Sequence, residues 1–309
     1  MSSDETPYTP IADQEVLAFI ERTEDCYPDG AVELSIVEQR ALYDRMAASF
    51  RQPRPGGTDF SDLAIGGPGG PLHLRSYRVA GQGQPRVLYF HGGGFVVGGL
   101  DSHDDVCAEI AARCHVEVIS TDYRLCPEHP HPAAYDDALA VIAYASDRPI
   151  ILAGDSAGAN LVAAAALTRP AAVTGQVLIY PGLGGEAVGL QSYRDHANAP
   201  LLTTEDVHAY HRIRHGGAVP AADPTSAPLM AEDFYGLAPC FVSSAEVDPL
   251  RDDGIEYVRR LQTAGVKATV SIEAQLPHGY LRARATSARA KAAFDRIIDA
   301  IVGMAEAAP

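Results

Sequence analysis

The sequence predicts an α/β fold, with a mostly parallel central sheet, helices on both faces and a small helical cap. Short, mostly apolar runs recur along the chain, as is typical of strands that are buried on both faces of a sheet. The segments between these runs repeat apolar residues at helical spacing. Strands that alternate with helices form parallel sheets, which bind ligands beyond the carboxyl ends of their strands. We therefore expect the functional residues directly after strands.

Two helices are predicted before the first strand. Residues 13–23 carry apolar side chains at helical spacing, and Ser35-Ile-Val-Glu38 has the pattern of a capping box that starts a second helix. We expect three side chains of the second helix to face inward, namely Val37, Ala41 and Met46. Residues 1–52 are therefore predicted to form an N-terminal helical cap segment.

A Pro/Gly-rich stretch at residues 53–57 precedes the predicted sheet. Residues 62–65 and 72–79 flank a glycine-rich turn, and we expect them to pair as an antiparallel edge. The apolar runs that predict the other strands are residues 86–90, 116–120, 150–153, 176–179, 240–243 and 268–272. The apolar faces of the helices expected between and after these strands are Val106, Ile110 and Cys114; Tyr135, Ala138, Leu139 and Ile142; Leu161, Val162, Ala165 and Ala166; Ile255, Val258 and Leu261; and Phe294, Ile297, Ile298 and Ile301.

Residues 183–228 break the alternation, because they contain no convincing strand. Thr203-Thr-Glu-Asp206 has the pattern of a helix N-cap, and Val207 and Tyr210 follow it at helical spacing. An insertion of this length in a compact domain usually covers something. We therefore predict a catalytic domain over residues 53–309, in which residues 183–228 form an inserted cap or lid.

The composition excludes several classes of protein. Asp and Glu number 40 against 24 Lys and Arg, so the net charge of −16 disfavours nucleic acid as a partner. No apolar run approaches the roughly 18 residues that a bilayer span needs, and the acidic start is unlike a signal peptide. We expect a cytoplasmic protein with no membrane partner. The 5 cysteines lack CxxC spacing, which favours packing thiols over disulfides or a zinc site.

The pentapeptide Gly154-Asp-Ser-Ala-Gly158 is the first candidate for catalysis. It fits the G-x-S-x-G pattern between a predicted strand and a predicted helix, which is the context that a nucleophile elbow requires. The two glycines suit a turn so tight that a side chain would clash, and such a turn exposes Ser156 above the helix N-terminus. The alternative is an ordinary strand-to-helix turn in which Ser156 caps the helix.

His91-Gly-Gly-Gly94 directly follows another predicted strand. Three successive glycines let the backbone approach a substrate and aim N–H groups at one point, as stabilisation of an oxyanion requires. The alternatives are a flexible loop and a phosphate cradle. A phosphate cradle is disfavoured, because no G-x-x-x-x-G-K-[ST] pattern follows and the next residues, Phe95-Val-Val-Gly98, are mostly apolar.

A serine nucleophile needs an adjacent base, and the base needs a carboxylate that orients it. His278 is the candidate base, since it lies after the last predicted strand and before the final helix. The segment after the preceding strand offers Asp248 and Glu246 as the acid. We favour Asp248, because Pro249 fixes an extended conformation before it. Glu246 stays open, as does a purely structural Asp248 that precedes the next helix.

These motifs together resemble the hormone-sensitive lipase-like esterases, the bacterial family IV of the α/β-hydrolase superfamily. The resemblance spans residues 89–280 and extends to further blocks of sequence. These are Asp122-Tyr-Arg-Leu-Cys-Pro-Glu-His-Pro130, Asp136-Asp137, Asp248-Pro-Leu-Arg251 and His278-Gly279. The predicted elements outside residues 89–280 suit the N-terminal cap and the terminal helix of that family.

The resemblance implies the α/β-hydrolase fold and a serine carboxylesterase. Ser156 would be the nucleophile, His278 the general base and then acid, and Asp248 the residue that orients the imidazole. The implied oxyanion donors are the backbone N–H groups of Gly93, Gly94 and Ala157. Supporting roles are expected for His91, which would anchor its turn, and for Tyr123, Arg124, Pro127 and Glu128, which would hold the neighbouring loop by charge-assisted hydrogen bonds.

The expected reaction is hydrolysis of uncharged, short-chain carboxylic esters through a covalent acyl-enzyme. A peptidase or a lactonase with the same apparatus is the alternative, and a non-catalytic ligand receptor on the same fold is the third hypothesis. Candidate pocket walls near the lid are Phe95, Val97, Tyr193, Leu201 and Val207. The expected partner is a small-molecule ester, and a homodimer is left open. No cofactor or metal is expected, although His129 and His131 lie near two aspartates.

Overall fold

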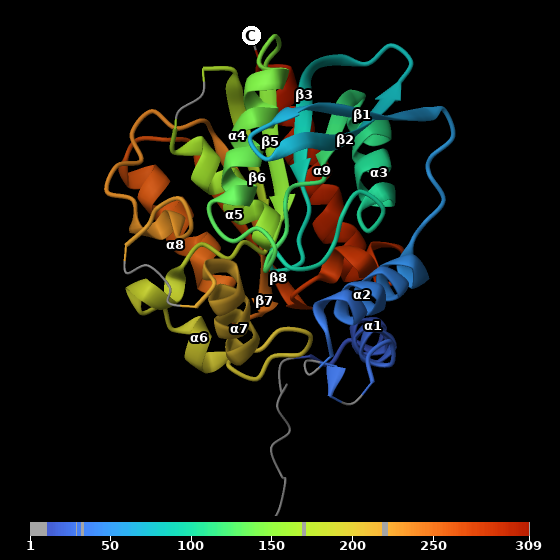
Figure 1. The fold of residues 1–309 in the computed structure, drawn as a ribbon, viewed down its shortest axis with the longest axis vertical. Helices are drawn as coiled ribbons and strands as arrows, with labels where there is room; N and C mark the ends of the chain where they lie inside the picture. The colour runs from blue at the N-terminus through green and yellow to red at the C-terminus, as the bar shows by residue number, and fades with distance from the viewer. Residues whose placement is uncertain (1–10, 29, 32–33, 169–170, 218–221, 309) are drawn as a thin grey trace, which may run out of the picture.

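The computed structural model describes residues 11–28, 30–31, 34–168, 171–217 and 222–308. The remaining parts of the two predicted cap segments, residues 1–10, 29, 32–33 and 218–221, lie outside the described residues. Within the described part, eight strands form one sheet in the order β1-β2-β4-β3-β5-β6-β7-β8 (Figure 1). The strands are β1 Thr58–Gly67, β2 Gly70–Val79, β3 Gly83–Phe90, β4 Val116–Thr121, β5 Ile150–Asp155, β6 Val173–Ile179, β7 Cys240–Val247 and β8 Ala268–Pro277.

The sheet is mostly parallel, as the sequence predicts. β1 pairs antiparallel with β2, and β2 pairs antiparallel with β4, so the expected antiparallel edge is present. All pairs from β4 across to β8 are parallel. Every residue of β4 and β5 is buried, which explains why these strands appear in the sequence as mostly apolar runs.

Helices cover both faces of the sheet (Figure 1). One face carries α3 (Asp104–Cys114) and α9 (Ala288–Ala307). The other face carries α4 (Ala133–Ala145), α5 (Ala157–Ala166) and α8 (Arg251–Thr263). The predicted α/β class, with a parallel sheet between two helical layers, is therefore confirmed.

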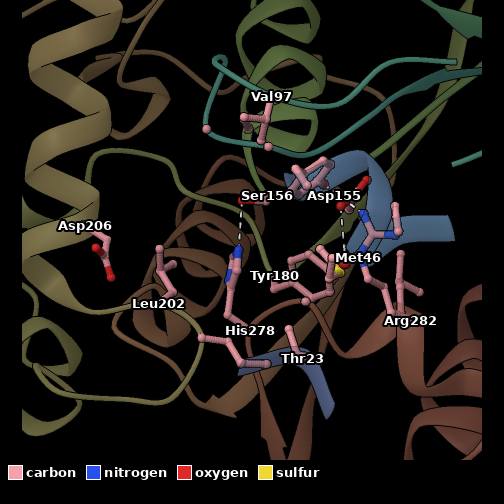
Figure 2. Close-up of a pocket in the computed structure, with 18 of the residues that line it drawn as sticks. Thr23, Met46, Val97, Asp155, Ser156, Tyr180, Leu202, Asp206, His278 and Arg282 are labelled. Atoms are coloured by element: carbon pink, nitrogen blue, oxygen red, sulfur yellow. Dashed lines mark hydrogen bonds between the residues drawn. The ribbon is translucent and has the colours of Figure 1, made fainter. Parts of the chain in front are cut away.

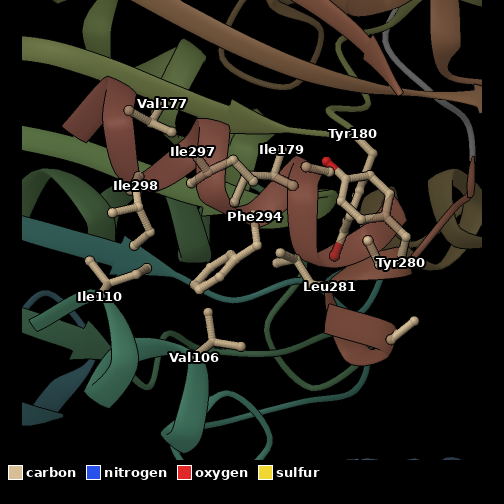
Figure 3. Close-up of a cluster of buried hydrophobic side chains, with 14 of the residues drawn as sticks. Val106, Ile110, Val177, Ile179, Tyr180, Tyr280, Leu281, Phe294, Ile297 and Ile298 are labelled. Carbon is tan, nitrogen blue, oxygen red and sulfur yellow. The ribbon is translucent and has the colours of Figure 1, made fainter. Parts of the chain in front are cut away.

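The core is divided by the sheet into two apolar clusters. Figure 3 shows part of the first, in which Phe294 and Ile298 of α9 lie beside Val106 and Ile110 of α3. Consecutive residues of β6 point to opposite faces of the sheet, since Val177 belongs to this cluster and Leu178 to the other. The cysteines pack as free thiols, and all except Cys26 are buried.

The N-terminal helices α1 (Gln14–Glu24) and α2 (Ile36–Phe50) begin where the sequence predicts, and Ser35 and Glu38 form the expected capping box. The predicted inward face of α2 is partly wrong. Met46 is buried, but Val37 is 73% exposed and Ala41 is also exposed. The buried face is Leu42, Met46, Ala47 and Phe50. A capping box determines where a helix starts. Which side of the helix is buried depends instead on the surface against which the helix packs.

The inserted segment forms η2 (Gly185–Val188), α6 (Ser192–Asp195), α7 (Thr204–His215) and η3 (Pro228–Met230). Figure 1 shows α6 and α7, and separately α1 and α2, near the end of the sheet toward which the central strands point. The short helix η4 (Tyr280–Ala285) follows β8. Among the residues described, no helix combines the length and the apolar character that crossing a bilayer would require.

Candidate active site

Three side chains from distant parts of the chain meet at the carboxyl end of the parallel sheet. Ser156 lies between β5 and α5, Asp248 follows β7, and His278 follows β8. The Nδ1–H of His278 donates to Asp248 Oδ2 at 2.7 Å. With Nδ1 as the donor to Asp248, the opposite ring nitrogen, Nε2, accepts a hydrogen bond from the Ser156 hydroxyl at 2.9 Å (Figure 2). In this arrangement the imidazole can take a proton from serine while the carboxylate holds its tautomer.

The turn that carries Ser156 is strained and closely packed. Ser156 has φ +51° and ψ −115°, a left-handed backbone region that side-chain-bearing residues rarely adopt. A Cβ at Gly154 would lie 2.7 Å from the carbonyl oxygen of Phe90, and a Cβ at Gly158 would collide with the same oxygen. The glycines on either side of the serine therefore permit α5 to start directly against β3.

Asp248 is the carboxylate that faces the imidazole, and Glu246 is not. Asp248 is 1% exposed, and its Oδ1 accepts the backbone N–H of Leu250 at 2.8 Å. Glu246 instead accepts the backbone N–H of Gln275 at 2.7 Å. The two carboxylates are separated because β7 extends to Val247, which places Asp248 beyond the end of the strand while Glu246 is still within it.

The glycine loop after β3, which carries two of the expected oxyanion donors, depends on glycine for its backbone shape. Gly93 and Gly94 have φ values of +124° and +60°. A Cβ at Gly93 would collide with the carbonyl oxygen of Val97, so the turn requires glycine there. Within the described residues, the N–H groups of Gly93, Gly94 and Ala157 donate to no protein acceptor. They are available to an oxygen beside Ser156.

Asp155 holds this loop from beneath, which the sequence analysis did not anticipate. Its Oδ1 accepts the backbone N–H of Gly92 at 3.0 Å and the hydroxyl of Tyr89 at 2.8 Å. Burial raises the pKa of Asp155, but His103, Tyr89 and Arg282 outweigh burial and hold that pKa well below its ordinary value. The predicted strand ended at residue 153, whereas β5 extends to Asp155 and buries it. A buried carboxylate must have donors around it, but the sequence placed Asp155 in the turn and so gave no sign of this role.

Two of the expected supporting residues, Tyr123 and Arg124, have partners near this loop, whereas Glu128 pairs with Arg40 of α2. Tyr123 donates from its hydroxyl to the carbonyl oxygen of His91 at 2.7 Å. His91 is fully buried and bonds through Nδ1 to the carbonyl oxygen of Gly92 at 2.8 Å. Burial and the charge of His103 lower the pKa of His91 to about 4, so its ring is neutral near pH 7. Arg124 pairs with Asp137. These contacts assign His91 a structural role.

Ser156 and His278 border a cavity of about 600 Å³. Figure 2 shows Met46 of α2 on one side of Ser156 and Leu202, just before α7, on the other. Four of the five predicted pocket residues line this cavity, namely Phe95, Val97, Leu201 and Val207. Tyr193 does not. It packs behind the wall with Leu202 and Leu250 and donates from its hydroxyl to Asp253 Oδ2 at 3.2 Å, because that buried carboxyl group needs donors.

His131, which lies near two aspartates in the sequence, binds residues of the inserted segment. Its Nε2 lies 3.0 Å from Asp223 Oδ2 and 3.0 Å from the hydroxyl of Thr225. In the described ranges of the chain, no three or more His, Cys, Asp or Glu side chains are grouped as a metal site would need.

Comparison with known proteins places the chain in a family. Residues 87–282 match the family model of the alpha/beta hydrolase fold. The carboxylic ester hydrolase LipN of Mycobacterium tuberculosis (strain ATCC 25618 / H37Rv) is 35% identical, over 88% of this chain and 77% of its own length. Esterase LipI of the same strain is 38% identical, over 78% of this chain and 81% of its own length. A hyperthermophilic esterase from the archaeon Pyrobaculum calidifontis superposes with a TM-score of 0.87 at 29% identity, covering 96% of this chain and 99% of its own. The α/β-hydrolase fold is thus confirmed, and the chain belongs to the hormone-sensitive lipase-like esterases of the α/β-hydrolase superfamily.

Proposed function

We propose that this protein is a carboxylic ester hydrolase that cleaves uncharged, short-chain acyl esters through a covalent acyl-enzyme. One observation carries the proposal: a single imidazole, His278, bonds to both Ser156 and Asp248 at 2.9 and 2.7 Å. Serine becomes an effective nucleophile only when a base is this close. The names of the relatives, which are esterases and ester hydrolases, support the same reaction class.

In the first half-reaction, Ser156 Oγ attacks the carbonyl carbon of the ester while His278 Nε2 takes the hydroxyl proton. The carbonyl oxygen becomes an oxyanion, which the N–H groups of Gly93, Gly94 and Ala157 would stabilise. Each such donor contributes about 3 kcal/mol to transition-state stabilisation in enzymes of this kind. Collapse of the intermediate breaks the bond to the alcohol oxygen, and the imidazolium returns its proton to that oxygen.

In the second half-reaction, water attacks the acyl group on Ser156. His278 Nε2 takes a proton from the water, and the same N–H groups receive the second oxyanion. Collapse then breaks the bond to Ser156 Oγ, which regains its proton from the imidazolium, and the carboxylic acid leaves. Asp248 remains ionised throughout, since its task is to hold the imidazole and balance its positive charge.

A small substrate fits the cavity. Its volume of about 600 Å³ lies within the roughly 300–1,000 Å³ that is typical of small-molecule sites. Apolar side chains such as Phe95, Val97 and Leu201 contribute to its walls, which suits an uncharged acyl group. Phe19 and Met46 of the N-terminal helices also line it, and a cavity of this size suits short acyl chains.

The substitution Ser156→Ala tests the nucleophile. We expect the folded variant to lose ester hydrolysis by at least about 10⁴-fold, as other serine hydrolases do. Ser61→Ala, in the exposed part of β1, is the matched control and should retain full activity. Labelling with a fluorophosphonate, followed by mass spectrometry, should modify Ser156 alone. Substantial ester hydrolysis by Ser156→Ala would contradict the proposal.

Two further comparisons test the acid and the substrate class. Asp248→Asn should lower kcat by roughly 10⁴-fold, because the amide favours the wrong imidazole tautomer, whereas Glu246→Gln should leave kcat near the wild-type value. p-Nitrophenyl esters from acetate to palmitate, assayed beside lactones and amino-acid anilides, should give the highest kcat/KM for short esters. A maximum at palmitate would overturn the short-chain assignment, and preferred turnover of lactones or anilides would favour the alternative hydrolases.

A further inference from the structure

Arg214, near the end of cap helix α7, is one of the largest fully buried side chains of the protein. It is only 2% exposed. Burial lowers the pKa of its guanidinium to about 10, so it remains charged at neutral pH. Among the residues that the structure describes, no carboxylate lies within ion-pair distance of it, and the negative charge of Asp223 offsets the effect of burial only in part. Burial of a charged group that has no ion-pair partner costs free energy. The buried position of Arg214 therefore suggests a role other than stabilising the fold.

The guanidinium of Arg214 contacts three separate segments. Its plane lies over the ring of Phe95, with 3.7 Å between the guanidinium carbon and the ring centroid. Its Nη2 donates to Asn160 Oδ1 at 3.1 Å. Its Nη1 donates to the carbonyl oxygen of Ser226 at 2.9 Å. Asn160 is itself fixed, because its Nδ2 donates to the carbonyl oxygens of Gly182 and Ser226 at 2.7 and 2.9 Å.

Two of these segments supply the expected oxyanion donors. Phe95 directly follows Gly94 and has φ +66°, a conformation that needs outside support in a residue with a side chain. Asn160 lies in the first turn of α5, and its N–H donates to the carbonyl oxygen of Ser156 at 3.1 Å. Arg214 therefore contacts the glycine loop on one side and the nucleophile helix on the other.

The end of α7 is also held in place from behind. The carbonyl oxygen of Arg214 accepts the N–H of His131 at 2.8 Å, in the loop that follows β4. His211 and His215 flank Arg214 on α7, and burial followed by the charge of Arg214 lowers the pKa of each to about 4. Both rings are therefore neutral near pH 7.

We propose that Arg214 is a positioning residue that sets the distance between the two parts of the oxyanion hole, so that the cap contributes to transition-state stabilisation. Its stack on Phe95 and its bond to Asn160 hold Gly93 and Gly94 opposite Ala157. Oxyanion donors act only when they lie about 3 Å from the developing charge. This role rests on the proposed ester hydrolysis.

The test compares Arg214→Met and Arg214→Lys with the control Arg212→Met. Methionine fills the buried volume without a charge, a replacement that buried ion sites often tolerate. Lysine keeps the charge but lacks the planar group that stacks on Phe95 and reaches two acceptors at once. Arg212 lies on the same helix, is more than half exposed and pairs with Glu205.

We expect both Arg214 variants to lower kcat for p-nitrophenyl butyrate by about 10- to 100-fold, with KM changed by less than about 3-fold. A trifluoromethyl ketone forms a tetrahedral adduct with the serine, so its Ki should rise by the same factor as kcat/KM falls. Arg212→Met should differ from wild type by less than about 2-fold in each quantity. Circular dichroism and thermal melting would verify folding.

A folded Arg214→Met protein with wild-type kcat, or with only KM raised, would overturn the proposal. Full rescue by Arg214→Lys would do so as well, since it would show that charge alone matters. If neither variant folded, Arg214 would be a structural residue and the proposal would again be wrong. Failure of the proposed function is distinguishable, because the wild-type protein would then neither hydrolyse the ester nor bind the ketone.

Discussion

Gly154→Ala tests whether the close approach of α5 to β3 is needed for catalysis. A Cβ at Gly154 would lie 2.7 Å from the carbonyl oxygen of Phe90 and 2.7 Å from the carbonyl carbon of Gly158. Ordinary contact begins near 3.4 Å, so these neighbours must retreat by about 0.7 Å. Both are backbone atoms, which cannot rotate away as the end of a side chain can. Ser156, two residues farther on, must move with them.

The size of the effect follows from this displacement. Overpacking a closely packed interior costs about 1–3 kcal/mol, and each kcal/mol lowers Tm by roughly 2–4 °C in a chain of this size. A misplacement of about 1 Å at a reacting group costs up to about 100-fold in rate. We therefore expect Gly154→Ala to lower Tm by several degrees and to lower kcat by roughly 10- to 100-fold.

Gly303→Ala is the matched control. The same substitution is made in α9, where the added Cβ would meet nothing within 4 Å. Alanine favours helices over glycine by about 1 kcal/mol, so this variant should be slightly more stable and equally active. Calorimetry and hydrolysis of p-nitrophenyl acetate would measure both variants. A Gly154→Ala protein with the Tm and kcat of wild type would refute the close approach of these elements.

Three further predictions concern stability and the cavity. Burial raises the pKa of Asp253 from 3.8 to about 7. The contribution of this group to stability is therefore full below about pH 4 and is lost progressively as pH rises through 7. Urea unfolding should show Asp253→Asn gaining about 3 kcal/mol relative to wild type between pH 5 and pH 8, and parallel pH dependences would contradict this. Tyr123→Phe removes the donor to the carbonyl oxygen of His91. Because a buried acceptor then loses its partner, the free energy of unfolding in denaturant should fall by about 1–3 kcal/mol. An unchanged unfolding midpoint would count against that bond. The ring of Tyr210 lies against Gly94 in the cavity wall. Its removal in Tyr210→Ala should make room for a longer acyl chain and raise the ratio of kcat/KM for p-nitrophenyl octanoate over acetate by about 10-fold or more. An unchanged ratio would place the acyl chain elsewhere.

Much of the fold and of the candidate site could be predicted from local sequence. Strands such as β4 and β5 are buried on both faces, and so they appear as apolar runs that are easy to recognise. Ser156, Asp248 and His278 each follow a parallel strand, and the carboxyl ends of such strands lie at one edge of a sheet. Their convergence could therefore be expected before any coordinates.

Other features depend on surfaces that local sequence does not reveal. The start of α2 is set by a capping box of neighbouring residues, but Val37 is exposed because the side of α2 that is covered depends on its packing partners. Tyr193 lies behind the cavity wall because the buried carboxyl group of Asp253 binds its hydroxyl. Neither outcome is visible in the spacing of residues along a helix.

The chain's pattern of residues thus specifies its strands, its strained turn and the identity of its reactive groups, because each depends on chemistry within a few residues. The position of Arg214 between Phe95 and Asn160 and the shape of the cavity were decided by packing. These features join residues that are far apart in the sequence, and their distances are set by how whole helices and strands fit against one another, to within fractions of an ångström.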